Sequence, residues 1–233
     1  MPKSPTLTRI SEPMTCCDDV WEKAYLRFET AKEETVKFQK RLTRLGASAW
    51  KKDSRVVEIF SGRCNGLKAL SSLGFTRLEG VDLSERLLKQ YDGAGDLYVC
   101  DCRKLPFPDQ SRDIIIVQGG LHHLPNVRQH VPEVFEEVSR VLTPHGQFIA
   151  VEPWHTPFLS FVHSLTRNRL LRRAWPKLDA LSIMIDRERT TYEAWLNENE
   201  FILKQLRRVF QPKLCQARWG KLLFVGGKKS SAT

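Results

Sequence analysis

The sequence predicts an α/β fold built on a doubly wound, mostly parallel sheet, with an antiparallel strand pair near its C-terminal end. Strand-like and helix-like segments alternate between residues 56 and 152, which is the pattern of successive βαβ units. The run DIIIVQ, residues 113–118, has the continuous apolar character of a central parallel strand. Two strand-like segments then follow each other at 201–211 and 220–226, so we expect them to add an antiparallel edge.

The first part of the chain is expected to be a loose tail, residues 1–17, followed by one long amphipathic helix. Apolar residues recur at spacings of three, four and seven from 18 to 45, and Gly46 can end the helix. Within a segment 18–52, this helix could pack on the core or cover a site as a lid. The alternating segments predict strands at 56–60, 77–82, 97–100, 113–118 and 147–152, and helices at 66–73, 84–91 and 127–142.

The segment between the fifth strand and the final strand pair fits no sheet element. Residues 153–190 are rich in Arg, Leu and Phe, so we expect a helical insertion that caps the main domain, residues 53–227. A further helix is predicted at 191–199, and residues 228–233 are expected to be a tail.

The composition bounds the classes of function. The 233 residues carry a formal net charge of +10, which admits nucleic acid, anionic lipid or a phosphorylated substrate as partners, or a solvated basic surface. No apolar run approaches the roughly 18 residues of a membrane-spanning helix, and the start lacks the apolar core of a signal peptide, so we expect a cytoplasmic protein. The six cysteines form no CxxC pair and no zinc-type spacing with histidine, so we expect reduced thiols and no metal site.

Polar residues stand where successive predicted strands end. Glu58 and the loop 60–66 follow the first strand, Asp82 the second, Asp101 the third and Gln118 the fourth. In an open α/β sheet, ligands bind beyond the carboxyl ends of the strands, at the point where the strand order reverses. We therefore expect these side chains to share one site. Asp82 lies 24 positions beyond Glu58, where a carboxylate can accept both hydroxyls of a ribose.

Four stretches carry a resemblance to a known family. VVEIFSGRCNG, LEGVDLSERLL, CDCRKLPFPDQSRDIIIVQGGLHHL and EVSRVLTPHGQFIAVEP resemble the class I S-adenosylmethionine (SAM)-dependent methyltransferases, which have a Rossmann-like sheet. LPFPDQSRDII and LHHL are most like the small-molecule branch typified by quinone-biosynthesis enzymes. The resemblance covers roughly residues 56–227 and implies SAM as the cofactor. It implies that Glu58 orders the loop and the SAM amine, that backbone at Gly62 approaches the methionine moiety, and that Asp82 binds the ribose.

The resemblance extends to further cofactor contacts. Asp101 matches the acid near the adenine amine, Cys102 follows it with a backbone N–H, and Gln118 lies where the methionine portion is held. The full set of expected cofactor-binding residues is Glu58, Phe60, Ser61, Gly62, Arg63, Asp82, Leu83, Asp101, Cys102 and Gln118.

The loop after the first strand departs from the family pattern. The usual G-x-G-x-G is replaced by Phe60-Ser61-Gly62-Arg63-Cys64, and positive φ is unfavourable for residues with a Cβ. Gly66 is an alternative position for the second glycine. Arg63 could pair with the cofactor carboxylate or with an acidic neighbour. We interpret the stretch as a modified cofactor loop, and loss of cofactor binding is the alternative.

The residues expected at the acceptor side follow the fourth and fifth strands. Histidine has a pKa suited to a general base, so His122, His123 and Glu152 are the catalytic candidates, although the histidines could equally cap a turn or pack. The basic stretch RNRLLRRAWPK, residues 167–177, could bind an anion or a membrane surface, or could be a solvated face. Trp21, Tyr25 and Phe28 could line the site from the other side. The candidate substrate-binding residues are Tyr25, His155, Arg169, Arg173 and Tyr192.

Three functional hypotheses remain after these observations. The first is a SAM-dependent methyltransferase acting on a small molecule or a lipid-linked, anionic precursor, with peripheral membrane contact possible. The second is an RNA methyltransferase, which the charge permits; no RNA-binding motif supports it, so we expect nucleic acid not to be the partner. The third is a non-catalytic binding protein that keeps the fold. A nicotinamide-dependent dehydrogenase fits poorly because G-x-G-x-x-G is absent.

Overall fold

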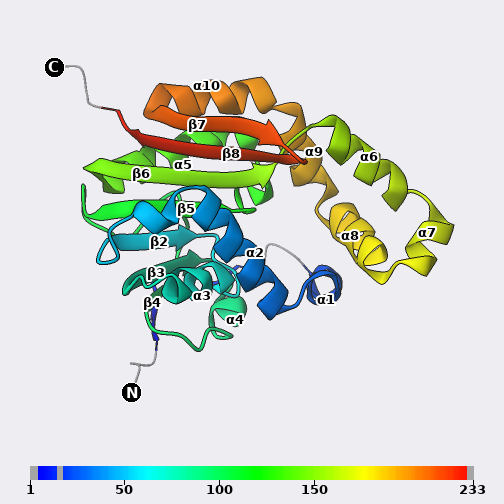
Figure 1. Ribbon diagram of the computed structural model, residues 1–233, viewed down its shortest axis with the longest axis horizontal. Helices are drawn as coiled ribbons and strands as arrows, with labels where there is room; N and C mark the ends of the chain where they lie inside the picture. The colour runs from blue at the N-terminus through cyan, green and yellow to red at the C-terminus, as the bar shows by residue number, and fades with distance from the viewer. Residues whose placement is uncertain (1–4, 15–17, 230–233) are drawn as a thin grey trace.

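The protein is built around an eight-stranded sheet in the order β1-β4-β3-β2-β5-β6-β8-β7, seen in a computed structural model that describes residues 5–14 and 18–229 (Figure 1). Strands β1 to β6 pair in parallel, and β8 pairs antiparallel with β6 on one side and with β7 on the other. This confirms the predicted α/β fold with a C-terminal antiparallel pair. The strands are β1 Thr6–Arg9, β2 Arg55–Ile59, β3 Arg77–Asp82, β4 Asp96–Val99, β5 Arg112–Gln118, β6 Leu142–Pro153, β7 Phe210–Arg218 and β8 Lys221–Lys228.

Helices cover both faces of the sheet and bury two apolar clusters. One cluster lies under α5, α9 and α10 and contains Phe135, Phe148 and Trp195. The other lies under α2 and α3 and contains Leu42 and Leu67. The helices are α1 Asp19–Phe28, α2 Ala31–Arg44, α3 Asn65–Ser72, α4 Glu85–Leu88, α5 Val127–Val141, α6 Pro157–Thr166, α7 Arg169–Ala174, α8 Pro176–Arg187, α9 Arg189–Asn197 and α10 Asn199–Val209, with 3-10 turns at Ala47–Ala49 and Leu121–His123.

The N-terminal region differs from the prediction in two ways. Residues 6–9, expected in a loose tail, form β1, which pairs with β4 at the edge of the sheet. The rest of that predicted tail falls partly on residues 1–4 and 15–17, which lie outside the described residues. The predicted single helix over 18–45 is two helices, because Thr30 has an extended backbone and starts α2 through a reciprocal capping box with Glu33.

The C-terminal strand prediction was wrong for residues 201–209. These residues form α10, because Ile202 and Leu206 are four positions apart and are both buried on the helix face that packs against α5. The first strand of the final pair is β7, which covers most of the stretch that we had taken as a connection. Lys228, expected in the tail, ends β8, and residues 230–233 lie outside the described residues.

The insertion after β6 is a group of short helices at one end of the sheet. Helices α6, α7 and α8 follow one another there, and α8 packs against α1, which brings the N-terminal helix and the insertion together over the same end (Figure 1). None of the described helices is both long and apolar enough to cross a lipid bilayer.

Candidate active site

A cavity of about 520 Å³ opens at the carboxyl ends of β2, β3, β4 and β5, where the strand order reverses between β2 and β5. Helices α1 and α2 and the α8–α9 junction close it from above. Twelve of the predicted site residues line it: Tyr25, Glu58, Phe60, Ser61, Gly62, Asp82, Leu83, Asp101, Cys102, Gln118, His122 and His123. Six do not: Arg63, Glu152, His155, Arg169, Arg173 and Tyr192.

The loop after β2 keeps an alternating left-handed backbone without the usual glycines. Phe60, Gly62 and Cys64 have φ values of 53°, 51° and 57°, so two residues with a Cβ adopt the conformation that we had expected them to avoid. Such a conformation typically costs about 1–3 kcal/mol at each residue, and surrounding structure must hold it. The amide of Gly62 donates to Asp82 Oδ2 at 2.8 Å, and the amide of Cys64 donates to Ser61 O at 2.7 Å.

Gly66 is required for a different reason than backbone conformation. A Cβ built on Gly66 would lie 1.8 Å from Oε1 of Glu58, so only glycine lets the first turn of α3 approach that carboxylate. The loop therefore retains the geometry of a cofactor loop. Space near Gly62 remains open, because a Cβ there would meet no atom within 4 Å.

Arg63 points away from the cavity and pairs with an acidic neighbour. Its Nη2 lies 3.1 Å from Oε2 of Glu34, and both side chains are less than a tenth exposed. The guanidinium also stacks on the ring of Tyr25, whose hydroxyl donates to the same Glu34 carboxylate, as does Asn65 Nδ2. Of the two roles predicted for Arg63, the structure shows the ion pair, and the residue serves to anchor α1 and α2 to the loop.

Glu58 carries an unsatisfied oxygen inside the cavity wall. Its Oε1 accepts from Gln118 Nε2 at 3.2 Å, whereas its Oε2 is buried and has no hydrogen-bond partner among the described residues. Burial, together with the Glu34 and Asp82 carboxylates, raises the pKa of Glu58 from 4.5 to about 8, against a smaller lowering by the Gln118 hydrogen bond. A buried carboxyl with one free oxygen fits a ligand that brings its own cation. Gln118 is held in turn by Arg41 Nη1 at 3.1 Å.

Asp82 and Asp101, at the ends of β3 and β4, differ in the hydrogen-bond partners that they already have. Asp82 accepts from the amides of Gly62 and Ser84 at 2.8 and 2.7 Å and borders the cavity. Asp101 borders the cavity too, but Arg103 binds it with Nη2 at 2.6 Å and Nε at 3.0 Å. A ligand amine at Asp101 would therefore share the carboxylate with Arg103.

The fourth and fifth strand ends place two histidines at the far side of the cavity. Glu152 is fully buried behind His122 and accepts from the amides of Gly120 and Leu121 and from His122 Nδ1, at 2.8, 3.0 and 2.9 Å. Glu152 is in contact with His122 and does not line the cavity, so it reaches the cavity only through His122, and its predicted catalytic role stays a prediction.

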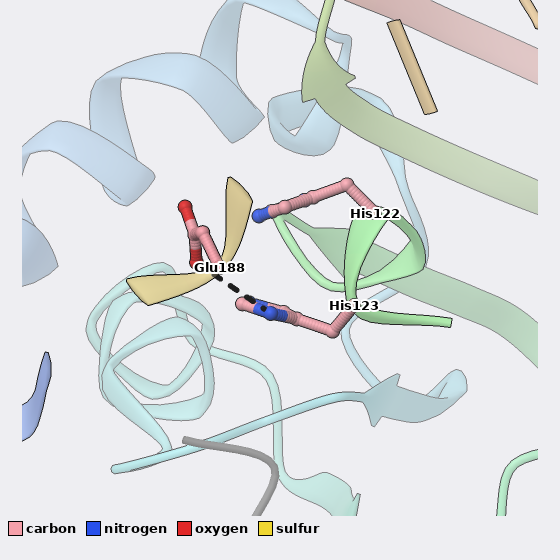
Figure 2. A group of neighbouring side chains, drawn as sticks. All are labelled: His122, His123 and Glu188. Carbon is pink, nitrogen blue, oxygen red and sulfur yellow. Dashed lines mark ion pairs between the residues drawn. The ribbon is translucent and has the colours of Figure 1, made fainter. Parts of the chain in front are cut away.

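His123 faces Glu188, which sequence reasoning had missed. Figure 2 shows both imidazole rings directed toward the Glu188 carboxylate, and Nδ1 of His123 lies 3.6 Å from Glu188 Oε2. Burial, together with the neighbouring His122, holds the pKa of His123 well below its usual value. Trp21 Nε1 donates to Glu188 at 2.9 Å, so α1 and the α8–α9 junction meet at this point.

Comparisons with known proteins agree with this geometry. Residues 57–150 match the profile of a family described as a methyltransferase domain. That segment carries the modified loop, Asp82, Asp101, Gln118 and both histidines. In this segment the chain is similar to a methyltransferase domain.

Curated relatives share only part of their length with this chain. The uncharacterized methyltransferase YcgJ of Bacillus subtilis is 43% identical over 68 residues, which cover 28% of this chain and 25% of that protein. The ubiquinone/menaquinone biosynthesis C-methyltransferase UbiE of Rickettsia massiliae is 28% identical over 114 residues, which cover 43% of this chain and 44% of that protein. The chain thus spans less than half the length of these relatives.

Solved structures extend the similarity in fold to nearly the whole chain. The PH0226 protein of Pyrococcus horikoshii superposes with a TM-score of 0.62 at 17% identity and covers 91% of this chain and all of that one. A structure described as a possible SAM-dependent methyltransferase of Methanococcus maripaludis superposes with a TM-score of 0.60 at 14% identity, covering 95% and 98%. At these identities, the likeness shows the fold alone.

Residues predicted from the insertion do not reach the cavity of the methyltransferase domain. His155 is exposed at the end of β6, and Arg169 and Arg173 are exposed on α7, so none of them lines this cavity, and their contact with a substrate stays a prediction. Tyr192 lies behind His122, with ring centroids 5.8 Å apart, and hydrogen bonds to His163. The basic stretch at 167–177 can be recognised from the sequence. The pattern of residues in that stretch does not show on which side of α7 the cavity lies.

A second and larger depression of the domain surface lies between α2 and the β7–β8 hairpin. It has a volume of about 1120 Å³ and contains none of the predicted site residues. Its lining is basic: Lys32, Lys37, Lys40, Arg41, Arg44, Arg218 and Lys221. We refer to these seven residues as the α2 basic groove.

Proposed function

We propose that the protein is a SAM-dependent methyltransferase that acts on a small molecule. The observation that carries this proposal is the free Oε2 of Glu58 in the cavity wall, with the Asp82 carboxylate at the end of the next strand. The ammonium group of SAM would supply the cation that Glu58 lacks, and its ribose hydroxyls would bind Asp82. Relatives named as methyltransferases, including UbiE, support a small-molecule acceptor.

Methyl transfer from SAM requires the protein mainly to position the acceptor. SAM supplies a methyl group on a sulfonium, which an acceptor displaces in line, so much of the rate comes from holding the acceptor near that methyl group in a dry site. His122 borders the cavity, and Glu152 fixes its Nδ1, which leaves Nε2 for the acceptor side. An imidazole oriented in this way can take a proton from an acceptor that must lose one.

Asp82→Ala should weaken SAM binding by about 1.5–3 kcal/mol, which is roughly 10- to 150-fold, because the ribose would lose charge-assisted hydrogen bonds. The measurement is calorimetric titration of parent and variant with SAM. Asp53→Ala is the matched control, since Asp53 is exposed and borders neither cavity. Unchanged affinity in a folded Asp82→Ala protein would refute the ribose assignment. A parent that binds no SAM would instead favour a non-catalytic binding protein with this fold.

We further propose that helices α6 and α7 form a membrane-contact surface, which suits a lipid-linked acceptor. Six exposed large apolar side chains gather on this part of the molecule. Phe158 and Phe161 lie on α6, Leu170 and Leu171 on α7, Trp175 at the end of α7, and Trp219 at the tip of the β7–β8 hairpin. Phe158 packs edge-on against Trp219, which joins α6 to the hairpin. Arg169 and Arg173 are exposed on α7 among these side chains, and apolar residues with neighbouring arginines are typical of segments that lie on anionic membranes.

Replacing Arg167, Arg169 and Arg173 with Gln should reduce binding to vesicles containing anionic phospholipid by about 100-fold, at roughly 1 kcal/mol for each basic residue near the surface. Binding is measured by vesicle sedimentation at low and high salt, because screening should weaken it. The control changes Lys32, Lys40 and Arg44 of the α2 basic groove to Gln, which removes the same charge from another surface. An equal loss in both variants would mean that net charge, and not the α6–α7 surface, attracts the membrane.

A further inference from the structure

We propose that His122, His123 and Glu188 bind a divalent transition-metal ion at the acceptor end of the cavity. One possible ligand atom from each of the three side chains lies within 4.8 Å of the others, and all three residues border the cavity. Figure 2 shows the two rings and the carboxylate directed toward one another from the turn Leu121–His123 and the α8–α9 junction. Two imidazoles and one carboxylate form a ligand set that leaves coordination positions open for a substrate.

The distances are compatible with a shared ion after small side-chain rotations. Ligand atoms around one tetrahedral ion lie about 3.3–3.4 Å apart when each metal–ligand bond is about 2.0–2.1 Å. His123 Nδ1 and Glu188 Oε2 are already 3.6 Å apart. The remaining separations are at most 4.8 Å and must shorten by up to about 1.4 Å when an ion binds.

Neighbouring residues hold two of the three proposed ligands through hydrogen bonds of the kind found around metal ligands. Glu152 Oε2 lies 2.9 Å from His122 Nδ1, which leaves the lone pair of His122 Nε2 directed away from Glu152. Trp21 Nε1 donates to Glu188 Oε2 at 2.9 Å, which restricts that carboxylate. Metal-bound histidines usually donate their other ring N–H to a carboxylate or carbonyl, and ligating carboxylates are hydrogen-bonded in turn.

An ion at this place would also define the acceptor class. This step rests on the proposed function. With His122 Nε2 bound to the ion, the ion would take the place of the imidazole base: a coordinated hydroxyl would lose its proton to solvent more readily, because the cation stabilises the oxyanion. That oxygen would then form the bond to the methyl carbon as the S–CH3 bond of SAM breaks and its electron pair stays on sulfur. Open coordination positions favour an acceptor with two neighbouring oxygen atoms, which can bind the ion as a chelate. The hydrocarbon part of such an acceptor would face the apolar wall of the cavity.

The test is titration of the apo protein with Co²⁺ and with Zn²⁺, followed by calorimetry and, for Co²⁺, by visible absorption. We expect one equivalent to bind in the parent, and binding to disappear in Glu188→Gln. Trp21→Phe removes the hydrogen bond to Glu188, keeps an aromatic ring beside Tyr25 and His123, and should weaken the affinity by about 10- to 100-fold. His145→Ala should bind like the parent, because His145 is exposed near the opposite end of β6.

Two outcomes would overturn the proposal. Either the parent binds no ion at micromolar concentrations, or Glu188→Gln binds as tightly as the parent. Trp21→Phe keeps the test informative if Glu188→Gln fails to fold. SAM titration of the same proteins separates this result from the proposed function: SAM binding without metal binding rejects only the metal site, and metal binding without SAM binding rejects the methyltransferase assignment while the ion site stands.

Discussion

Arg63→Ala should lower the free energy of unfolding by about 3–5 kcal/mol, the usual loss when one partner of a buried ion pair is removed. The guanidinium is the only cation that the structure places on the buried Glu34 carboxylate among the described residues, at 3.1 Å. Tyr25 and Asn65 would still donate to Glu34, but they are neutral and leave its charge uncompensated. Urea denaturation of parent and variant measures the difference.

Two further variants separate charge from packing at this position. Arg189→Ala is the matched control, because its ion pairs with Asp186 and Glu193 are exposed and should change stability by less than about 1 kcal/mol. Arg63→Met combined with Glu34→Gln removes both charges and should recover part of the lost stability. An Arg63→Ala protein within 1 kcal/mol of the parent would contradict the anchoring role.

The order of the elements could be predicted because it depends on periodicity. The run at 113–118 and the alternation around it are properties of neighbouring residues, so they identify β5 and the βαβ units. The prediction failed where a local signal was overlooked or ambiguous. The capping box of Thr30 and Glu33 divides the predicted first helix into two. The apolar residues of α10 are compatible with both a strand and a helix, and the spacing of four between the buried Ile202 and Leu206 is what favours the helix.

The cofactor side of the site was more predictable than the acceptor side. Glu58, Asp82, Asp101 and Gln118 each lie at or just beyond the carboxyl end of a strand, and parallel strands end at the same edge, so topology alone brings them together. Glu188 meets His123 across 65 positions of chain through an insertion whose packing has no sequence signature. The sequence also does not show that Arg63 pairs with Glu34, which lies 29 positions away.

Phe60 and Cys64 show why a residue-level rule can mislead. Phe60 and Cys64 each carry a Cβ, which makes positive φ unfavourable for them when neighbouring structure is ignored. For this reason the sequence suggested a changed loop. Hydrogen bonds from the loop to Val81 and Asp82 hold the backbone in place, and Cys64 is fully buried in the core under α3. Tertiary contacts outweigh the local preference, so the left-handed backbone at positions 60 and 64 persists without glycine at either one.

SAM affinity should rise by up to about tenfold for each pH unit as the pH approaches 8 from below, because Glu58 must lose its proton to bind an ammonium group, and it should fall again above about pH 8, where the ligand's own α-ammonium group loses its proton. The pKa of Glu58 in the folded protein is raised to about 8 by burial, whereas an exposed glutamate has 4.5. The free protein therefore holds this proton below about pH 8, and binding a cation at the carboxylate must expel it.

The sign of the accompanying stability change follows from the same shift. Between pH 4.5 and 8 the folded state holds a proton that the unfolded state has lost, so the Glu58 contribution to stability is fully present below pH 4.5 and falls as the pH rises toward 8. The slope is about 1.4 kcal/mol per pH unit at most. Glu58→Gln should remove this slope and also make the weaker residual SAM affinity independent of pH.

Calorimetric titration with the demethylated product of SAM, in buffers of different ionisation enthalpy, measures both the affinity and the number of protons released. Near pH 7 we expect close to one proton to be released by the parent and none by Glu58→Gln, because the free Oε2 of Glu58 is the atom that would receive the ligand's ammonium group. Affinity that is constant from pH 6 to 8 with no proton release would mean that the ammonium binds elsewhere. In that case Asp82 and the loop amides, and not Glu58, would have to provide the selectivity for the cofactor.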